Sequence, residues 1–404
     1  MTHTHTTHSP AEITDATLRP ELTGYATARL ALAYAIAING TILMPFLVTA
    51  IMTRLHVDEG MATQIAGVEI LGVALACAVL PRWIARGAHA FAVAGAVGTI
   101  VGQVASDLAP SIALMSAARA VSGVFEGMLF VVVASSVAHR ACADSIWGKI
   151  NVLAGGINGS VLVAVSLLPP IWFGRWLFAL LAGIVAILAP FVVRIDRFAE
   201  TSRLSLAGTP ARLPKRLVVA LWIVTVLIYG AQASQWAVAG IVGERAGLSQ
   251  TTIGILLSVS SLLGFAGAIV PMQRACHPYR LTIIGLAQLV MIVCITVFFA
   301  STGATSYFVS QLVLNCAFFA IVPFLTGLLS EIDPDGSLVA RTVVVTFLGV
   351  GTGTALAGPL FDRYGSRHCA YMMGGAIVAA FPLVWISLKG SAQHLQLSAK
   401  SRLG

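Results

Sequence analysis

Long, uninterrupted apolar segments constrain this chain more than any other feature of its 404 residues. A helix needs about 20 consecutive apolar residues to cross a membrane, and in lipid only helices or closed barrels satisfy the polar backbone. The segments here are continuous and do not alternate, which favours helices. Charged residues make up only 10 % of the chain, against about 25 % in soluble domains. The sequence therefore predicts an all-α integral membrane protein.

Twelve such segments can be drawn. Their bounds are 26–52, 61–84, 90–108, 111–138, 149–170, 173–193, 217–240, 250–273, 280–301, 305–329, 339–361 and 369–388. The polar stretch 194–216 carries two prolines and divides them into two sets of six. We therefore predict two six-helix bundles, at 26–193 and 217–390, joined by a basic linker. The ends, 1–25 and 391–404, are predicted to be tails, the first of them disordered.

Basic residues are distributed unequally between the two sides of the predicted membrane. With the amino terminus inside, 18 of the 24 lysines and arginines fall in cytoplasmic segments and five in outer ones. Lysine and arginine accumulate on the cytoplasmic side, so we predict cytoplasmic termini and an inner-membrane location. The formal charge of +8 then reflects this orientation, and we predict no nucleic-acid partner.

Three charged residues lie deep within predicted spans: Glu69, Arg119 and Glu126. Buried intramembrane charges are costly and are usually paired or functional. Arg119 and Glu126 are seven residues apart, close to two helical turns, so they share one face about 10 Å apart in depth. Glu69 and Arg119 are predicted at the same depth and should pair. Glu126 then has no cation at its own level, so we expect it to bind and release a proton. The alternative is a static polar cluster that fixes helix packing.

A short motif and an internal repeat point to a known family. Arg119-x-x-Ser122-Gly123-x-x-x-Gly127 places an arginine before a glycine-rich face, and the ends of the second and eighth segments match at a shift of 190 residues. With two sets of six spans, this chain resembles the major facilitator superfamily, and within it the proton-driven drug and sugar efflux branch. The resemblance implies a cavity between two pseudo-symmetric bundles that rock against each other.

One motif of that superfamily stands in an unexpected place. The loop after the second span usually reads G-x-x-x-D-R-x-G-R-R, whereas here the closer string, Gly358-Pro-Leu-Phe-Asp362-Arg363-Tyr-Gly365-Ser-Arg367, follows the eleventh span. We interpret it as a helix-ending turn with a solvated charge cluster. A gating latch formed by Asp362 and Arg363 is the alternative.

The resemblance also implies a substrate cavity lined by the first, fourth, seventh and tenth spans. Besides Arg119 and Glu126, the polar and aromatic candidates there are Tyr34, Asn39, Tyr229, Gln232, Gln235, Trp236, Gln311, Asn315, Phe318 and Phe319. Gln232, Gln235 and Trp236 share one helical face and suit an amphipathic, partly aromatic solute. For Phe318 and Phe319 the alternative is simple packing.

Small-residue spacings permit close helix contact. Gly155-xxx-Gly159 and Gly349-xxx-Gly353 are predicted at the interface between the bundles, with ordinary tight packing as the alternative.

These features predict a secondary transporter that exports a small organic compound in exchange for protons. Proton-linked uptake of an organic anion is the alternative on the same scaffold, and an integral-membrane enzyme or passive channel is a remote one. The sequence has no GxxxxGK[ST] phosphate-binding loop, HExxH or GxSxG motif, so we predict neither ATPase nor other enzyme activity. We expect no cofactor or metal, and a monomer whose partners are solute, protons and lipid.

Overall fold

The structure is a computed structural model that describes residues 22–84, 87–137, 143–168, 170–195, 214–273, 276, 279–332 and 337–403. All elements within these ranges are helical. They are α2 (Gly24–Ala37), α3 (Asn39–Ile42), α4 (Met44–Leu55), α5 (Glu59–Val79), α6 (Pro81–Ile84), α7 (Ala88–Leu108), α8 (Ile112–Val137), α9 (Ala143–Ser166), α10 (Pro170–Val192), α11 (Lys215–Ala237), α12 (Ala239–Arg245), α13 (Gln250–Gly264), the 3₁₀ helix η1 (Phe265–Ala268), α14 (Ile269–Met272), α15 (Arg280–Phe299), α16 (Ala304–Ile332) and α17 (Ser337–Leu403).

The described residues contain nine helices long and apolar enough to cross a membrane. Two shorter apolar helices, Met44–Leu55 and Trp176–Val192, accompany them. The candidate span at Arg341–Ile386 is 46 residues long and covers both of the last two predicted segments. It breaks at Gly365, whose φ of 72° lies in the left-handed region that glycine adopts without steric cost.

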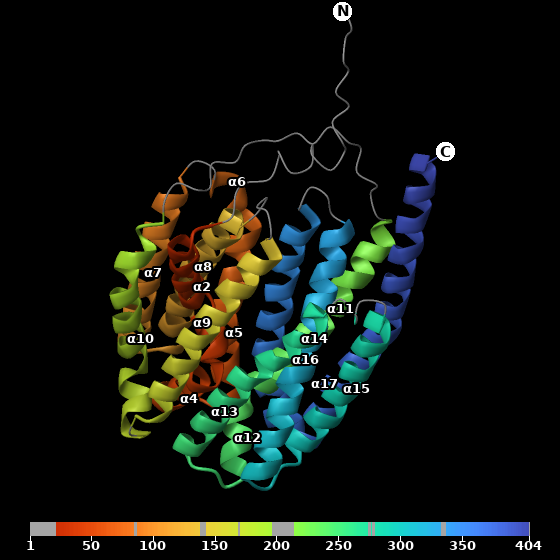
Figure 1. The fold of residues 1–404 in the computed structure, drawn as a ribbon. Coiled ribbons are helices and arrows are strands. Elements are labelled where there is room, and N and C mark those ends of the chain that lie inside the picture. The colour runs from red at the N-terminus through yellow and green to blue at the C-terminus, as the bar shows by residue number, and fades with distance from the viewer. Residues whose placement is uncertain are drawn as a thin grey trace, which may run out of the picture.

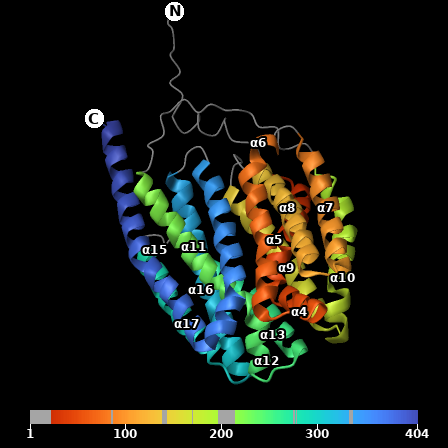
Figure 2. The same cartoon turned by 180° about the vertical axis from the view of Figure 1, so that it is seen from behind.

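The helices form two groups in the order of the chain. Figures 1 and 2 show α2 to α10, red to yellow-green, on one side, and α11 and α15 to α17, green to blue, on the other. The two groups meet where α5 packs on α17, where α9 packs on α13, and where α4 meets α11 and α12. The division of the spans into bundles at 26–193 and 217–390 stays a prediction.

Small residues line the contact between α5 and α17. A Cβ added to Gly67 would lie 2.7 Å from the Cβ of Ala355, and one added to Gly351 would lie 2.9 Å from Leu71 Cδ2. Larger side chains at these positions would therefore push the two groups of helices apart.

The predicted interface glycines divide into two pairs. Gly155 and Gly159 of α9 face Phe265 and Leu262, across the two groups as expected. Gly349 and Gly353 instead pack on α11 within their own group, where a Cβ on Gly349 would lie 2.9 Å from the Cα of Val226. That prediction was wrong because α17 contacts α11 on one face and α5 on another, and the spacing of small residues does not distinguish the two faces.

Two helices are interrupted midway along their length. Ile38 (φ −108°, ψ 6°) and Leu43 (φ −83°, ψ 8°) separate α2, α3 and α4, and Val238 (φ −97°, ψ 7°) separates α11 from α12. Pro45 in the first turn of α4 explains one break, because proline lacks an N–H and fits best where a helix begins. Interrupted helices at related positions of two repeats often mark a transporter's binding site.

Candidate functional site

Glu69, Arg119 and Glu126 form one buried cluster between α5 and α8. At most 1 % of each residue is exposed. Arg119 Nε donates to Glu69 Oε2 at 3.1 Å, and Nη2 donates to Oε1 of the same carboxylate. The predicted pairing of Glu69 with Arg119 is therefore confirmed, as a two-pronged ion pair of the kind that matches guanidinium geometry.

The remaining terminal nitrogen of Arg119 is occupied by α7. Nη1 donates to Gln103 Oε1 at 2.9 Å and to Ser106 Oγ at 3.3 Å, and the ring of Phe178 lies 5.3 Å from the guanidinium carbon. All three guanidinium nitrogens thus have acceptors. The sequence analysis missed Gln103 and Ser106, although two polar residues one turn apart in an apolar segment were a signal.

Glu126 is held differently from Glu69. Its Oε1 atom is buried and has no hydrogen-bond partner among the described residues, whereas both carboxylate oxygens of Glu69 accept from Arg119. Because Glu69 neutralises Arg119, the three residues have no net charge when Glu126 is protonated and one negative charge when it is not. The cluster therefore has a place for one exchangeable proton.

Glycines allow these side chains to meet. A Cβ added to Gly123 would collide with the backbone carbonyl of Glu69, and one added to Gly127 would lie 2.6 Å from the Cβ of Ala76. The glycine-rich face of the fourth-helix motif thus brings α8 against the backbone of α5. A Cβ on Gly40 would lie 2.7 Å from Glu69 Cδ, so this carboxylate also abuts the interrupted segment α3.

Four predicted residues of α11 and α16 form a chain of amide hydrogen bonds. Asn315 Nδ2 donates to the backbone carbonyl of Ser260 at 3.3 Å, which fixes the orientation of that amide. Asn315 Oδ1 then accepts from Gln232 at 3.0 Å and from Gln311 at 3.4 Å, and Gln311 Oε1 accepts from Gln235 at 2.6 Å. The carbonyl of Ser260 orients the Asn315 amide, and this in turn orients the other three amides in the series of hydrogen bonds.

Several buried side-chain oxygens of the predicted cavity residues have no donor. The Oε1 atoms of Gln232 and Gln235 and the Oδ1 atom of Asn39 are buried without a hydrogen-bond partner among the described residues. Gln232, Gln235, Gln311 and Asn315 are therefore brought together. Asn39 instead lines a small hollow beside Asn158, between α2, α9 and α10.

The other predicted cavity residues are engaged in packing or backbone contacts. Trp236 donates to the carbonyl of Ile42, next to the break after α3, at 3.2 Å. Phe318 packs edge-on to Tyr229 with ring centroids 5.1 Å apart, and Phe319 stacks on Phe265 at 4.3 Å.

An aromatic cluster that the sequence analysis missed joins the two groups. Phe130 of α8 packs edge-on against Phe347 of α17 with centroids 5.0 Å apart. Tyr34 and Trp147 complete the cluster, at 5.7 and 6.3 Å from Phe130. Phe130 is one turn beyond Glu126 on the same helix, so the cluster lies beside the charged site.

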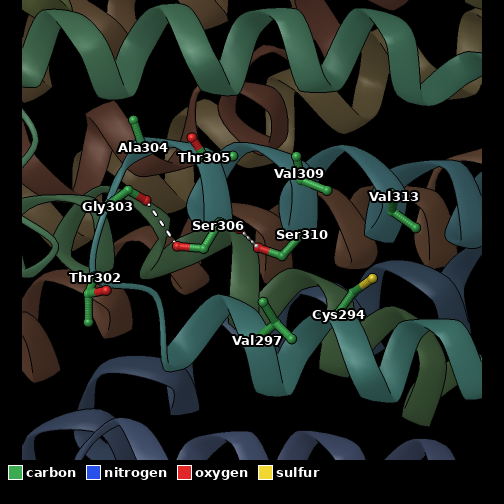
Figure 3. A pocket seen from close by; sticks show the side chains of 10 residues that line it. All are labelled: Cys294, Val297, Thr302, Gly303, Ala304, Thr305, Ser306, Val309, Ser310 and Val313. Carbon is green, nitrogen blue, oxygen red and sulfur yellow. Dashed lines mark hydrogen bonds between the residues drawn. The ribbon is translucent and has the colours of Figure 1, made fainter.

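A separate hollow of about 600 Å³ lies between α15 and α16. Figure 3 shows that its two serine hydroxyl groups are turned to nearby carbonyls, Ser306 to Gly303 and Ser310 to Ser306. Valines with exposed side chains form much of the remaining lining. None of the predicted site residues lines this hollow, so the site lies elsewhere.

The displaced motif joins the two groups at the lower end of Figure 1, where α4 leads into α5. Asp362 Oδ2 of α17 accepts a hydrogen bond of 2.6 Å from the backbone N–H of Gly60, in the first turn of α5. The N–H of Gly358 donates to Thr63 Oγ1 at 3.0 Å. A carboxylate at a helix amino terminus is favoured by the exposed N–H groups and the helix dipole.

A third contact lies beside these two. Arg245 of α12 pairs with Glu59 of α5 at 3.4 Å. The predicted turn is confirmed at Gly365, and Arg363 lies over the ring of Tyr364 at 5.6 Å. The prediction of a merely solvated cluster was wrong for Asp362, because its carboxylate is bonded to the opposite group. These contacts favour the latch interpretation.

If the hydrogen bond from Gly60 to Asp362 holds the two groups of helices together, hydrogen exchange should be faster when Asp362 is removed. In the Asp362→Ala variant, Gly60 loses its acceptor, which costs about 1 kcal/mol, and its N–H should exchange roughly fivefold faster. Hydrogen exchange of the peptide that contains the first turn of α5 measures this. Arg363→Ala is the matched control, because the contact that Arg363 makes among the described residues is with the ring of Tyr364, and it should leave that peptide unchanged. Equal rates in both variants would show that Asp362 does not stabilise the contact.

Comparisons with known proteins agree with this architecture. Residues 30–338 match the Major Facilitator Superfamily. No curated protein matches the sequence. Among solved structures, a D-xylose-proton symporter has a TM-score of 0.71 at 15 % identity, covering 89 % of this chain and 97 % of its own.

Two further solved structures are similar. The nucleoside transporter NupG has a TM-score of 0.70 at 13 % identity, with 91 % of this chain and 100 % of its own covered. The human organic anion transporter MFSD10 (TETRAN) has a TM-score of 0.62 at 14 % identity, with 89 % and 99 % covered. Identities this low show a shared fold, whereas the family match spans most of the sequence. The chain therefore belongs to the major facilitator superfamily.

Proposed function

We propose that this secondary transporter of the major facilitator superfamily couples solute movement to protons through Glu126. The observation that carries the proposal is the buried cluster of two carboxyl groups and one guanidinium, in which Glu69 and its neighbours occupy every nitrogen of Arg119. With one proton on Glu126 the cluster is neutral, and without it the cluster carries one negative charge.

The change of charge supplies a coupling mechanism. An uncompensated charge at the bilayer centre costs about 3 kcal/mol on insertion scales. The neutral cluster can therefore enter a closed, dehydrated conformation more easily than the charged one. Binding a proton on one side of the membrane and releasing it on the other would link the proton gradient to alternation between conformations.

We further propose the full topology of twelve spans with both termini in the cytoplasm, as a monomer in the cell inner membrane. In this assignment α2, α3 and α4 together form the first span, α11 and α12 the seventh, and α13, η1 and α14 the eighth. The two parts of α17 on either side of Gly365 form the last two. The excess of lysine and arginine on the assigned cytoplasmic side supports this orientation.

The free acceptors indicate the class of solute. Gln232, Gln235 and Asn39 each present a buried oxygen that lacks a donor, and a buried acceptor without a partner costs free energy that a ligand donor can recover. Arg119, the cation of the site, already has acceptors on all its nitrogens. We therefore propose a neutral solute rich in hydroxyl or N–H donors, in preference to an organic anion. D-xylose and nucleosides, named for two structural neighbours, belong to this class.

This proposal predicts a difference between each neutral ligand and its O-methylated form. Thermal stabilisation of the purified protein should be measured with D-glucose, uridine and myo-inositol, and with benzoate as an anion. Each neutral ligand that stabilises the protein should lose its effect when its hydroxyl groups are fully O-methylated, because the methylated form cannot donate. Stabilisation by benzoate alone would instead support the anion alternative.

Two directions of transport are candidates. The fourth-helix motif supports export in exchange for protons, whereas the likeness to a D-xylose-proton symporter supports uptake together with a proton. Uptake of a ligand found in the thermal screen should be compared in intact cells and inverted vesicles, each with and without a protonophore. Protonophore-sensitive accumulation in inverted vesicles indicates export, and in intact cells it indicates uptake. Insensitivity in both would contradict proton coupling.

A further inference from the structure

Arg119 has two carboxyl groups within reach of its charge. Glu69 approaches from α5, and Glu126 shares the face of α8; both act electrostatically on the guanidinium. No other titratable side chain faces Arg119 in the described structure, since α7 presents Gln103 and Ser106 to it and α10 presents Phe178. Which carboxyl group holds the arginine decides which one is free to exchange a proton.

Helix α7 determines that choice. Gln103 and Ser106 are one turn apart and present their oxygens to Nη1 of Arg119. Glu69 binds the other two nitrogens. The guanidinium is therefore fixed at both ends, on the side of α5 and α7, and no hydrogen bond from it to Glu126 is present.

The amide oxygen of Gln103 accepts from Arg119, whereas its amide nitrogen is left without an acceptor. Gln103 is fully buried, and its Nε2 atom has no hydrogen-bond partner among the described residues. Turning the amide over would point its donor at the donors of Arg119, so the guanidinium fixes the orientation. A side chain that leaves its own donor unsatisfied to accept from Arg119 breaks a local rule of polar burial, and such departures are expected at functional sites.

We propose that Gln103 and Ser106 are positioning residues that hold Arg119 on Glu69 and thereby keep Glu126 free of a salt bridge. This inference rests on the proposed role of Glu126. Without the two oxygens, Nη1 becomes a buried donor with no acceptor, and the carboxylate of Glu126, on the same face of α8, has an oxygen without a partner among the described residues. Pairing with Arg119 would stabilise the charged form of Glu126, so a higher proton concentration would be needed to protonate it.

Infrared titration of the purified, lipid-embedded protein tests this without a substrate. The C=O stretching band of the protonated Glu126 carboxyl group is assigned by its loss in Glu126→Gln. In Gln103→Leu, which has a similar size but no acceptor, the titration midpoint of this band should move to lower pH by about one unit or more. In Ser106→Ala it should move in the same direction by less, because that contact is the longer of the two at 3.3 Å.

Gln103→Glu is the matched control, because its carboxylate keeps an acceptor on Nη1 and the arginine in place. Its midpoint should not fall below that of the unmodified protein. A Gln103→Leu midpoint equal to that of the unmodified protein, or equal acid shifts in the Leu and Glu variants, would overturn the inference. Ser106→Ala removes a single oxygen and provides the test if Gln103→Leu does not fold. The proposed function fails separately, if Glu126→Gln still moves protons with solute.

Discussion

The Glu126→Gln variant is expected to exchange solute down its gradient but to move no protons with it. Glutamine has nearly the shape of a protonated glutamate and cannot ionise, so the cluster with Glu69 and Arg119 stays neutral at every pH. The barrier to alternation that the charged cluster imposes is then absent on both sides of the membrane. Because the membrane potential supplies about 2.3 kcal/mol per charge per 100 mV, uphill accumulation of roughly 50-fold should fall to about one.

Proteoliposomes with a trapped pH indicator measure both quantities in the same sample. The control is Glu244→Gln, an equally conservative change at the end of α12, where Glu244 hydrogen-bonds Gln250 outside the cluster. That variant should keep uphill transport and proton movement. If Glu126→Gln retained solute-dependent acidification, another group would carry the proton, and the mechanism proposed for this cluster would be wrong.

Depth along a helix was predictable from the sequence. The ends of a span are set by the membrane, so counting residues from them placed Glu69 and Arg119 at one level, and the structure pairs them. The turn at Gly365 was predicted from a different local signal, the glycines and charged residues of the string Gly358 to Arg367 after an apolar segment. These predictions use only rise per residue and hydropathy, which are local properties.

Rotation about a helix axis was not predictable in the same way. A membrane helix is apolar on the lipid side and on the protein side, so the pattern that orients a helix in a soluble protein is weak. Gly349 and Gly353 were therefore assigned to the wrong neighbour, and Gln103 was not linked to Arg119. The latch at Asp362 was left as the alternative interpretation because its partner is a backbone N–H of Gly60, which no side-chain motif reveals.

The packing partners of the aromatic residues were also not predictable from the sequence. Phe318 and Phe319 are adjacent, and the alternatives of cavity lining and packing were open. Each has a ring partner on another helix, Tyr229 and Phe265 respectively. Ring contacts of this kind depend on which spans are neighbours, which the order of the spans alone does not fix.

Arg119→Met is expected to be the most destabilising single substitution in the site. Methionine fills part of the space of arginine but leaves the Glu69 carboxylate, fully buried, with no cation. Removing one partner of a buried pair usually costs 3–5 kcal/mol, because the other charge stays buried and uncompensated. The Glu69→Gln/Arg119→Met double variant removes both charges and should recover most of this loss.

Thermal unfolding of the purified protein in one detergent compares these variants. The control is Arg54→Met, since Arg54 pairs with Asp107 at 3.6 Å with 22 % and 20 % of the two side chains exposed, and such partly hydrated pairs contribute at most about 1 kcal/mol. We expect Arg119→Met to lower the unfolding temperature far more than Arg54→Met, and the double variant to fall between them. If the double variant is as unstable as Arg119→Met, the guanidinium stabilises the fold mainly through Gln103, Ser106 and Phe178. Neutralising the charge of Glu69 is then the smaller contribution of Arg119 to stability.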